Sequence, residues 1–254
     1  MNLSNMKNTK FIVLFAIISS NLFCQNTKTD SLQPIKNMPF KYQSLIIPTA
    51  LIGYGIIGIE NDGLKLFNAN IKEEIRENID DKFSIDDISQ YVPFLSVYGL
   101  NALGIKGKNN FKDRTIILGT AYLIMGTTVY GMKKLTKVQR PDGSGKTSFP
   151  SGHTATAFMG AEFIYQEYKD VSIWYGISGY VVATGTGFFR MYNDKHWFTD
   201  VVAGAGIGIL STKIAYWIHP FIKKKIFKGK ETMNGIVIPF YNGKEYGLGL
   251  SMSF

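Results

Sequence analysis

The sequence predicts an all-α protein: a helical bundle of about six helices, embedded in a membrane through about five crossings, with a small C-terminal β-hairpin. Apolar runs of roughly 15–21 residues recur along the chain, at the lower edge of the ~20 residues that cross a bilayer. Charged residues make up only 19% of the 254 residues, where about 25% is usual in soluble proteins. Most of the 26 glycines lie inside apolar runs, a pattern that suits closely packed membrane helices.

The predicted helices follow these apolar runs. The clear runs are 115–132, 151–165, 173–189 and 198–218, and two weaker ones are 45–59 and 88–105. Between the weaker runs, the acidic segment 60–87 carries an apolar residue at every fourth position from Ile71 to Phe83, which predicts an amphipathic helix. A buried bundle that does not span a membrane is the alternative, because the mean hydropathy of the chain is close to zero.

The segment 235–254 has a different period. Ile236 to Ile238 read as a short strand, Asn242-Gly243 is a favoured hairpin turn, and apolar residues then alternate with Gly and Ser up to Phe254. We therefore expect a β-hairpin after a helical domain that covers 45–230.

The first residues have the features of a secretory signal. Segment 1–24 has a basic start, an apolar core and small residues close to Cys24. An uncleaved membrane anchor is the alternative. Segment 25–44 is polar, contains Pro34 and Pro39, and reads as a linker. Cys24 is the single cysteine, which excludes an intrachain disulfide.

The formal net charge of +9 is gathered in three clusters, at 106–114, 133–140 and 223–230. These clusters do not form a basic stripe with interleaved aromatic residues, so we expect no nucleic-acid partner. If 106–114 and 223–230 lie inside, five crossings satisfy the positive-inside tendency. The protein is then expected in the cell envelope, with its chemistry on the exported (periplasmic or extracytoplasmic) side of the membrane.

Polar residues suited to phosphate chemistry lie in three short segments between the apolar runs. In the first, Lys133 and Arg140 precede Pro141 at the end of a predicted helix. Lysine offers phosphate a point charge and arginine a planar fork of donors. Taken alone, this pair is better explained by the favourable position of cations at a helix C-terminus.

The second segment is Pro150-Ser151-Gly152-His153, at the expected start of a helix. Proline is tolerated at such a start, serine is a good N-cap, and glycine lets the backbone approach a ligand closely. Helix N-termini bind anions through their free N–H groups. An ordinary capped helix with an incidental histidine is the alternative.

The third segment contains Arg190, His196 and Asp200. His196 and Asp200 share one face if the segment is helical, or Asp200 lies in the first turn of the following helix. In either arrangement the carboxylate can fix the tautomer of the imidazole and leave its other nitrogen free as nucleophile or base. His219 precedes Pro220 at a helix end, and we expect it to be structural.

Together the three segments resemble the type-2 phosphatidic acid phosphatase superfamily, which also includes the vanadium haloperoxidases. In that family the first motif is a Lys followed, after six residues, by Arg-Pro, and the second is Pro-Ser-Gly-His. The third is Ser-Arg followed by five residues, a His, three residues and an Asp. Here the motifs read KKLTKVQRP from Lys133, PSGH at 150–153 and FRMYNDKHWFTD from Phe189. The resemblance covers about 115–210 and is stronger to the membrane lipid phosphatases. Phe189 replaces the family's serine.

The resemblance implies a role for each of these residues. His196 attacks phosphorus to form a phosphohistidine, Asp200 orients it, and His153 protonates the leaving oxygen and then activates water. The residues implied in phosphate binding are Lys133, Arg140, Ser151, Gly152 and Arg190. Three cations beside the equatorial oxygens agree with the dominance of charge stabilisation in phosphoryl transfer. We expect no cofactor and no metal.

The substrate is expected to be a phosphorylated lipid or isoprenoid, hydrolysed as a phosphomonoester or diphosphate. The candidates are phosphatidic acid, phosphatidylglycerophosphate, undecaprenyl diphosphate and a lipid A phosphate. The alternatives are a soluble exported non-specific acid phosphatase and a vanadium-dependent haloperoxidase. The sequence leaves open the leaving group, the oligomeric state and the role of the hairpin.

Overall fold

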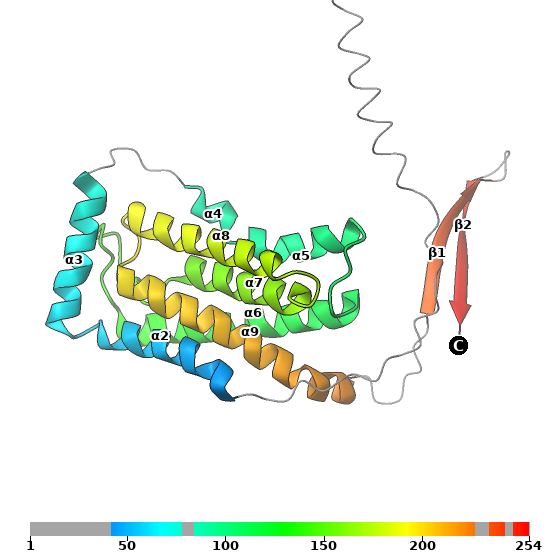
Figure 1. Cartoon of the computed structure of the whole chain (residues 1–254), viewed down its shortest axis with the longest axis horizontal. Helices are drawn as coiled ribbons and strands as arrows, with labels where there is room; N and C mark the ends of the chain where they lie inside the picture. Colours follow the sequence, from blue (N-terminus) through cyan, green and yellow to red (C-terminus); the bar gives the residue numbers. More distant parts are fainter. Residues whose placement is uncertain (1–41, 78–83, 227–233, 242–245, 254) are drawn as a thin grey trace, which may run out of the picture. The chain divides into compact units, whose positions relative to one another are not determined.

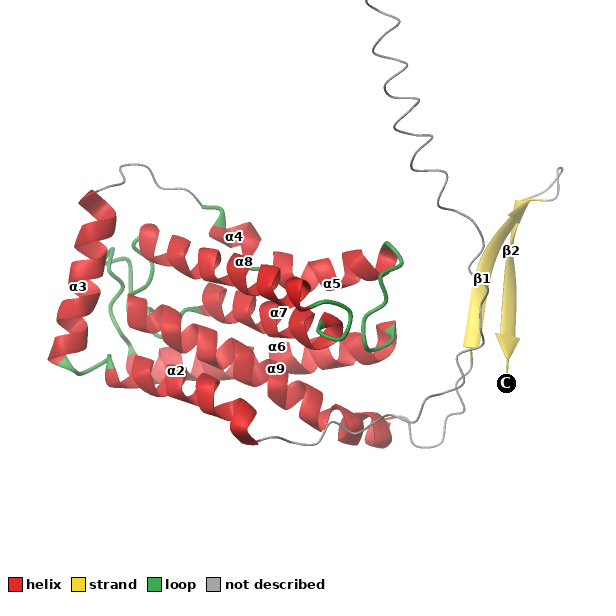
Figure 2. Cartoon of the chain, viewed as in Figure 1, coloured by secondary structure: helices red, strands yellow, loops and turns green. Residues whose placement is uncertain are grey.

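The computed structural model describes residues 42–77, 84–226, 234–241 and 246–253 (Figure 1). These residues form η1 (Tyr42–Leu45), α2 (Ile46–Ile57), α3 (Asp62–Glu77), α4 (Asp86–Ser89), α5 (Val92–Ala102), α6 (Phe111–Thr136), α7 (Gly152–Tyr168), α8 (Ile173–Tyr192), α9 (Phe198–Ile226), β1 (Asn234–Tyr241) and β2 (Tyr246–Ser253). The described chain is therefore mostly helical, as predicted (Figure 2). The predicted signal segment 1–24 and most of the linker 25–44 lie outside the described residues.

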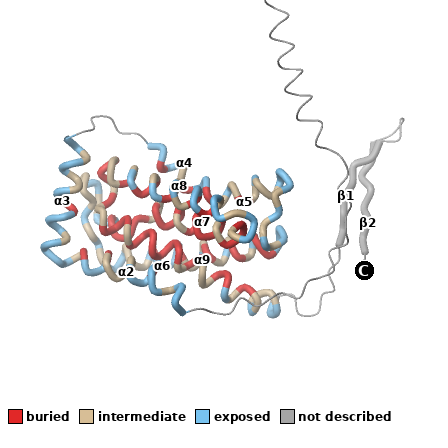
Figure 3. The backbone as a smooth tube through the Cα atoms, viewed as in Figure 1, coloured by how far each residue is buried: buried red, intermediate tan, exposed pale blue. Residues whose placement is uncertain are grey.

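Helix α7 forms the core of the bundle. It contacts α5, α6, α8 and α9, and most of its side chains are buried (Figure 3). Helix α9 lies so close to α7 that only glycine fits at two of its contact positions. A Cβ added at Gly204 would lie 2.5 Å from the carbonyl oxygen of Ser151, and one at Gly208 would lie 2.2 Å from that of Ala155. The backbones of α7 and α9 are therefore in direct contact.

Short polar side chains begin the long helices. The Asn110 side chain accepts a hydrogen bond from the backbone N–H of Asp113 at 2.9 Å at the start of α6. Ser151 caps α7 as predicted, and Ser172 caps α8. Such caps satisfy backbone donors that the first helical turn leaves unpaired. Helix α6 ends at Thr136, and its C-cap residue Lys137 adopts a left-handed conformation with φ of 49°.

The loop from α6 to α7 and the loop from α8 to α9 lie at the same end of the bundle. Hydrogen bonds join the two loops: the N–H of Asp142 donates to the carbonyl of Asp194 at 3.1 Å, and that of Ser151 to the carbonyl of Asp200 at 3.0 Å. All three predicted chemical segments belong to these two loops or to the helix ends beside them. The fold thus brings them together, although the sequence separates them.

Two described helices, spanning Phe111–Thr136 and Phe198–Lys225, are long and apolar enough to cross a membrane. A third span is possible if Tyr42–Ile57 and Asp62–Glu77, bent by 93°, count as one. The prediction of a crossing at 88–105 is corrected, because α5 has only 11 residues. At 1.5 Å per residue such a helix is roughly 16 Å long, well short of the ~30 Å hydrocarbon layer. The predicted total of five crossings counted this segment, so the described helices do not support that total.

Other predicted elements differ in extent from what the structure has. The acidic segment 60–87 contains α3, which ends at Glu77, and the short α4. Asp200 lies in the first turn of α9, whereas His196 precedes that helix, so the second of the two predicted arrangements is the one observed. At the C-terminus β1 pairs antiparallel with β2, with Asn234 opposite Ser253 and Tyr241 opposite Tyr246.

Candidate active site

His196 and Asp200 form a buried pair in the candidate site. Their side chains are only 2% and 3% exposed, and His196 Nδ1 lies 3.7 Å from Asp200 Oδ2. This distance is longer than a hydrogen bond, and Nδ1 has no hydrogen-bond partner among the described residues. Asp200 Oδ2 instead accepts from the Ser148 hydroxyl and from the backbone N–H of Trp197. The carboxylate is therefore fixed beside the imidazole.

Burial keeps the imidazole of His196 neutral. Desolvation lowers the pKa of His196 from 6.5 to about 4, and the charges of Lys133 and Arg190 lower it too, while Asp200 acts in the opposite direction. A neutral imidazole has a free lone pair at neutral pH. The ring is therefore in the protonation state that a nucleophile needs.

Two of the predicted phosphate-binding cations, Lys133 and Arg190, act electrostatically on this histidine, and the third, Arg140, acts on Lys133. Lys133 is within electrostatic range of Arg140, Asp200 and Arg190, and its ammonium donates to the carbonyl of Thr147. The backbone N–H of Arg140 donates to the carbonyl of Gly145 at 2.9 Å. The Nε atoms of Arg140 and Arg190 are buried without a hydrogen-bond partner in the described part of the chain. Buried unpaired donors are costly, so two of the three cations retain donor capacity for an anion.

Ser151 and Gly152 contribute in different ways. The Ser151 hydroxyl is fully buried and caps the helix by accepting a hydrogen bond from the backbone N–H of Thr154 at 3.4 Å, and it also lies 2.8 Å from Thr154 Oγ1. A Cβ at Gly152 would meet only Val129 Cγ1, at the ordinary contact distance of 3.7 Å. Packing within the chain therefore does not require glycine at position 152, which leaves close approach of a ligand as a reason for it.

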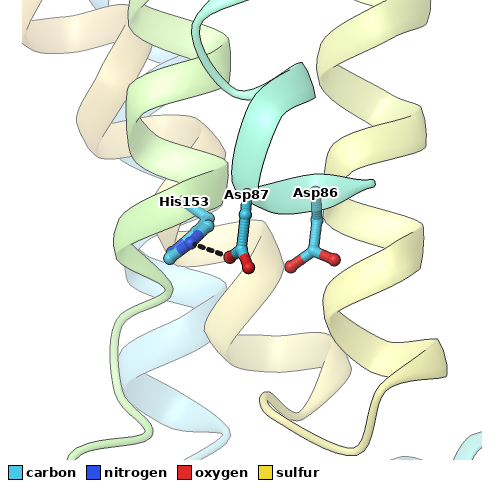
Figure 4. Close-up of side chains that lie close together, drawn as sticks. All are labelled: Asp86, Asp87 and His153. Carbon is cyan, nitrogen blue, oxygen red and sulfur yellow. Dashed lines mark hydrogen bonds and ion pairs between the residues drawn. The ribbon is translucent and has the colours of Figure 1, made fainter. Parts of the chain in front are cut away.

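His153 lies at the start of α7 and faces a part of the chain that the motifs did not include. Its Nε2 is 2.9 Å from Asp87 Oδ1, on the short helix α4 (Figure 4). This pair is more open than His196 and Asp200, since His153 is 31% and Asp87 62% exposed. His153 is thus accessible to a bound molecule.

The neighbouring Asp86 holds Arg190. Its carboxylate pairs with Arg190 Nη1 and accepts from Asn193 Nδ2 at 2.9 Å, and Asp86 itself is 1% exposed. Sequence reasoning missed both Asp86 and Asp87, placing them in a generic amphipathic helix. Asp87 lies 66 residues before His153 in the sequence, and no known spacing pattern connects an acidic pair to a motif at that distance.

Asp86, Asp87 and His153 also have the composition of a cation site. Each offers one ligand atom, and these atoms lie within 4.8 Å of one another. However, Arg190 Nη1 pairs with Asp86 and lies 3.9 Å from Asp87 Oδ1. The guanidinium therefore already supplies positive charge to both carboxylates, and the group fits a metal poorly.

Helix α3 supports the catalytic loops from the outside. The Asn68 side chain donates to Thr199 Oγ1 at 2.9 Å and accepts from the N–H of Thr199 at 3.2 Å. Lys72 donates to the carbonyl of Pro141 at 2.7 Å and lies over the ring of Trp197. Between α3 and these loops lies a cavity of about 320 Å³, mostly apolar and bordered by Asp200. The predicted structural role of His219 agrees with its position 3.3 Å from Asp113, on the far part of α9.

Comparison with known proteins gives matches to the same motifs. Residues 114–224 match the family model of the PAP2 superfamily. A lipid A 1-phosphatase from Porphyromonas gingivalis is 38% identical over 173 residues, which are 64% of this chain and 38% of that protein. This chain thus corresponds to well under half the length of that relative.

Two solved structures have weaker similarity. LpxE from Aquifex aeolicus is 22% identical with a TM-score of 0.44, over 59% of this chain and 94% of that one. A transmembrane PAP2-type phosphatidylglycerolphosphate phosphatase from Bacillus subtilis is 18% identical with a TM-score of 0.40, over 72% and 99% of the two chains. The family match contains all three motifs described above. The part of this chain that carries these motifs, residues 114–224, is therefore similar to the PAP2 superfamily.

Proposed function

We propose that this protein is a membrane phosphatase that hydrolyses the phosphate ester of a lipid through a phosphohistidine at His196. The observation that carries the proposal is the buried, neutral His196 beside Asp200, with Lys133, Arg140 and Arg190 around it. A neutral nucleophile beside three cations matches the needs of phosphoryl transfer, in which charge stabilisation dominates.

The proposed reaction has two steps. In the first, His196 attacks phosphorus, the P–O bond to the leaving group breaks, and His153 gives its proton to the leaving oxygen. In the second, His153 takes a proton from water, which attacks the phosphohistidine and releases phosphate. Asp200 stabilises the positive charge that His196 carries in between. Lys133, Arg140, Arg190 and the backbone at Gly152 hold the phosphate oxygens.

The apolar surface supports a lipid substrate. In the apolar 18-residue stretch of α6, a helix that is long enough to cross a membrane, only 22% of the residues are buried. The exposed residues of α6 include Leu123 and Tyr130. Such a surface is costly in water and suits a bilayer. Among the candidate substrates we place a lipid A phosphate first, because the relative from Porphyromonas gingivalis is named for that activity. We further propose that the site faces the exported side.

The test is phosphate release by the purified protein in detergent micelles. The substrates are a lipid A phosphate, phosphatidic acid and the soluble ester p-nitrophenyl phosphate. We expect faster release from the lipids, and labelled enzyme that is denatured in alkaline detergent should carry a phosphate that is stable in alkali and lost in acid. Turnover of the soluble ester alone would favour the non-specific acid phosphatase. Halide oxidation with added vanadate would favour the haloperoxidase.

A further inference from the structure

The charges around His153 are mainly negative. The charged groups that act most on His153 are Arg190, Asp87 and Asp86. The single guanidinium stands against two carboxylates, and its close partner is the buried Asp86. Arg190 balances the charge of Asp86, and the charge of Asp87 is left unbalanced. The part of the site beside His153 therefore carries net negative charge.

Asp87 is held in place although its side chain is exposed. Its helix α4 is fastened to α8 through Asp86, which pairs with Arg190, and through Ser89, whose hydroxyl lies 2.8 Å from that of Thr186. The backbone carbonyl of Asp87 accepts a hydrogen bond from Gln90 Nε2 at 2.9 Å. Its carboxylate is thus a positioned charge that a substrate can reach, rather than a freely moving surface group.

Any leaving group that His153 protonates comes close to this carboxylate. The leaving oxygen lies within about 3 Å of the ring nitrogen that gives the proton, and Asp87 Oδ1 is 2.9 Å from Nε2 of the same ring. Because the two nitrogens of an imidazole are about 2 Å apart, the leaving group consequently lies within roughly 8 Å of a negative charge. At such a distance, in a site partly open to water, one unit charge changes a rate by about tenfold.

The charge of the leaving group depends on the class of substrate. When the substrate is a phosphomonoester, the P–O bond breaks, the oxygen takes the proton of His153, and a neutral alcohol leaves. When the substrate is a diphosphate, the leaving group is itself a phosphate ester and carries negative charge toward Asp87. The first leaving group can hydrogen-bond to the carboxylate, and the second is repelled by it.

We propose that Asp87 is a specificity-determining residue that selects lipid phosphomonoesters with a neutral leaving group against lipid diphosphates. This inference rests on the proposed function, because it takes His153 as the acid of that reaction. It divides the candidate substrates: a lipid A monophosphate and phosphatidic acid suit the site, and an isoprenoid diphosphate does not.

The test compares farnesyl monophosphate with farnesyl diphosphate, which share one lipid tail and differ in the leaving group. The measured quantity is the ratio of kcat/KM for the diphosphate to kcat/KM for the monophosphate, in detergent with a chelator present. Asp87→Asn should raise this ratio about tenfold, while Asp87→Glu should keep the wild-type ratio. The matched control is Asp170→Asn, an exposed aspartate outside the site, which should also keep it.

Asp87→Asn also changes the hydrogen-bond partner of His153, and this change acts on the turnover of both substrates. The binding of the two ligands is then compared in the His196→Ala background, with and without Asp87→Asn. The ratio of the two dissociation constants should shift about tenfold toward the diphosphate. An unchanged ratio in either measurement overturns the role of Asp87. Failure of the wild-type protein to release phosphate from either ligand, or from any lipid ester, counts instead against the proposed function.

Discussion

The candidate site contains two histidine–aspartate pairs that differ in burial and in spacing. His196 and Asp200 are almost fully buried and lie 3.7 Å apart. His153 and Asp87 are partly exposed and lie 2.9 Å apart. His196 and Asp200 are four positions apart in the sequence. His153 and Asp87 lie on different helices and are 66 positions apart.

The difference in burial fits two different tasks. A buried imidazole loses its proton more easily and is shielded from water, which suits a nucleophile. An open imidazole can meet leaving groups of different size and exchange protons with water, which suits an acid and base. The buried pair is expected to determine whether the reaction occurs, and the open pair to determine on which substrate.

Removal of the buried histidine should have the largest effect. His196→Ala is expected to lower kcat by at least about 10⁴-fold, because no other group can form the covalent intermediate. The measurement is phosphate release from the best lipid substrate, with circular dichroism to confirm the helical fold. The matched control is His219→Gln, a histidine near Asp113 on the far part of α9, which should retain most activity. Near-normal turnover by His196→Ala would remove it as the nucleophile.

Removal of charge from the buried aspartate should have the next largest effect. Asp200→Asn is expected to lower kcat by about 10³-fold, because the amide cannot stabilise positive charge on His196. The dissociation constant for inorganic vanadate, which resembles the transferred phosphoryl group, should change much less. Asp170→Asn is the control for loss of an aspartate. An unchanged kcat in Asp200→Asn would exclude the orienting role.

Burial of His196 also predicts the response of the site to acid. The ring must be neutral to attack, and its pKa is lowered from 6.5 to about 4. The neutral form therefore still predominates at pH 5, and its fraction falls as the pH drops through about 4. We expect the rate of enzyme phosphorylation, measured by rapid quench, to fall with a midpoint near that pH. A midpoint near 6.5 would mean that the ring is solvated and that the two pairs do not differ as described.

Removal of divalent metal should have the smallest effect. Arg190 already pairs with Asp86 beside the open pair, so a chelator is expected to change kcat/KM by less than about twofold. The control is the same assay after excess Mg²⁺ is added back. A large loss that Mg²⁺ reverses would make Asp86, Asp87 and His153 a metal site.

The sequence alone predicts the buried half of the site better than the open half. His196, Asp200 and Arg190 lie within one loop and its helix ends, where spacing along the chain approximates spacing in space. Ser151 was also predicted correctly as an N-cap, because capping is a local effect. Asp86 and Asp87 could not be predicted in this way, since only the packing of α4 on α8 brings them to Arg190 and His153. The extent of α5 was missed because apolar composition continues through 88–105 while the helix ends at Ala102.

The glycines of α9 that contact α7 have a mechanical consequence. Gly204 and Gly208 lie against carbonyl oxygens of Ser151 and Ala155, and the two helices carry His153 and Asp200 at their adjoining ends. A methyl group at either glycine would push the two helices apart and move His153, the proposed acid, away from His196, the proposed nucleophile. The spacing of these two histidines therefore depends on the backbone contact between α7 and α9. Changes in the loops can alter which lipid binds, whereas the position of α7 relative to α9 can change very little.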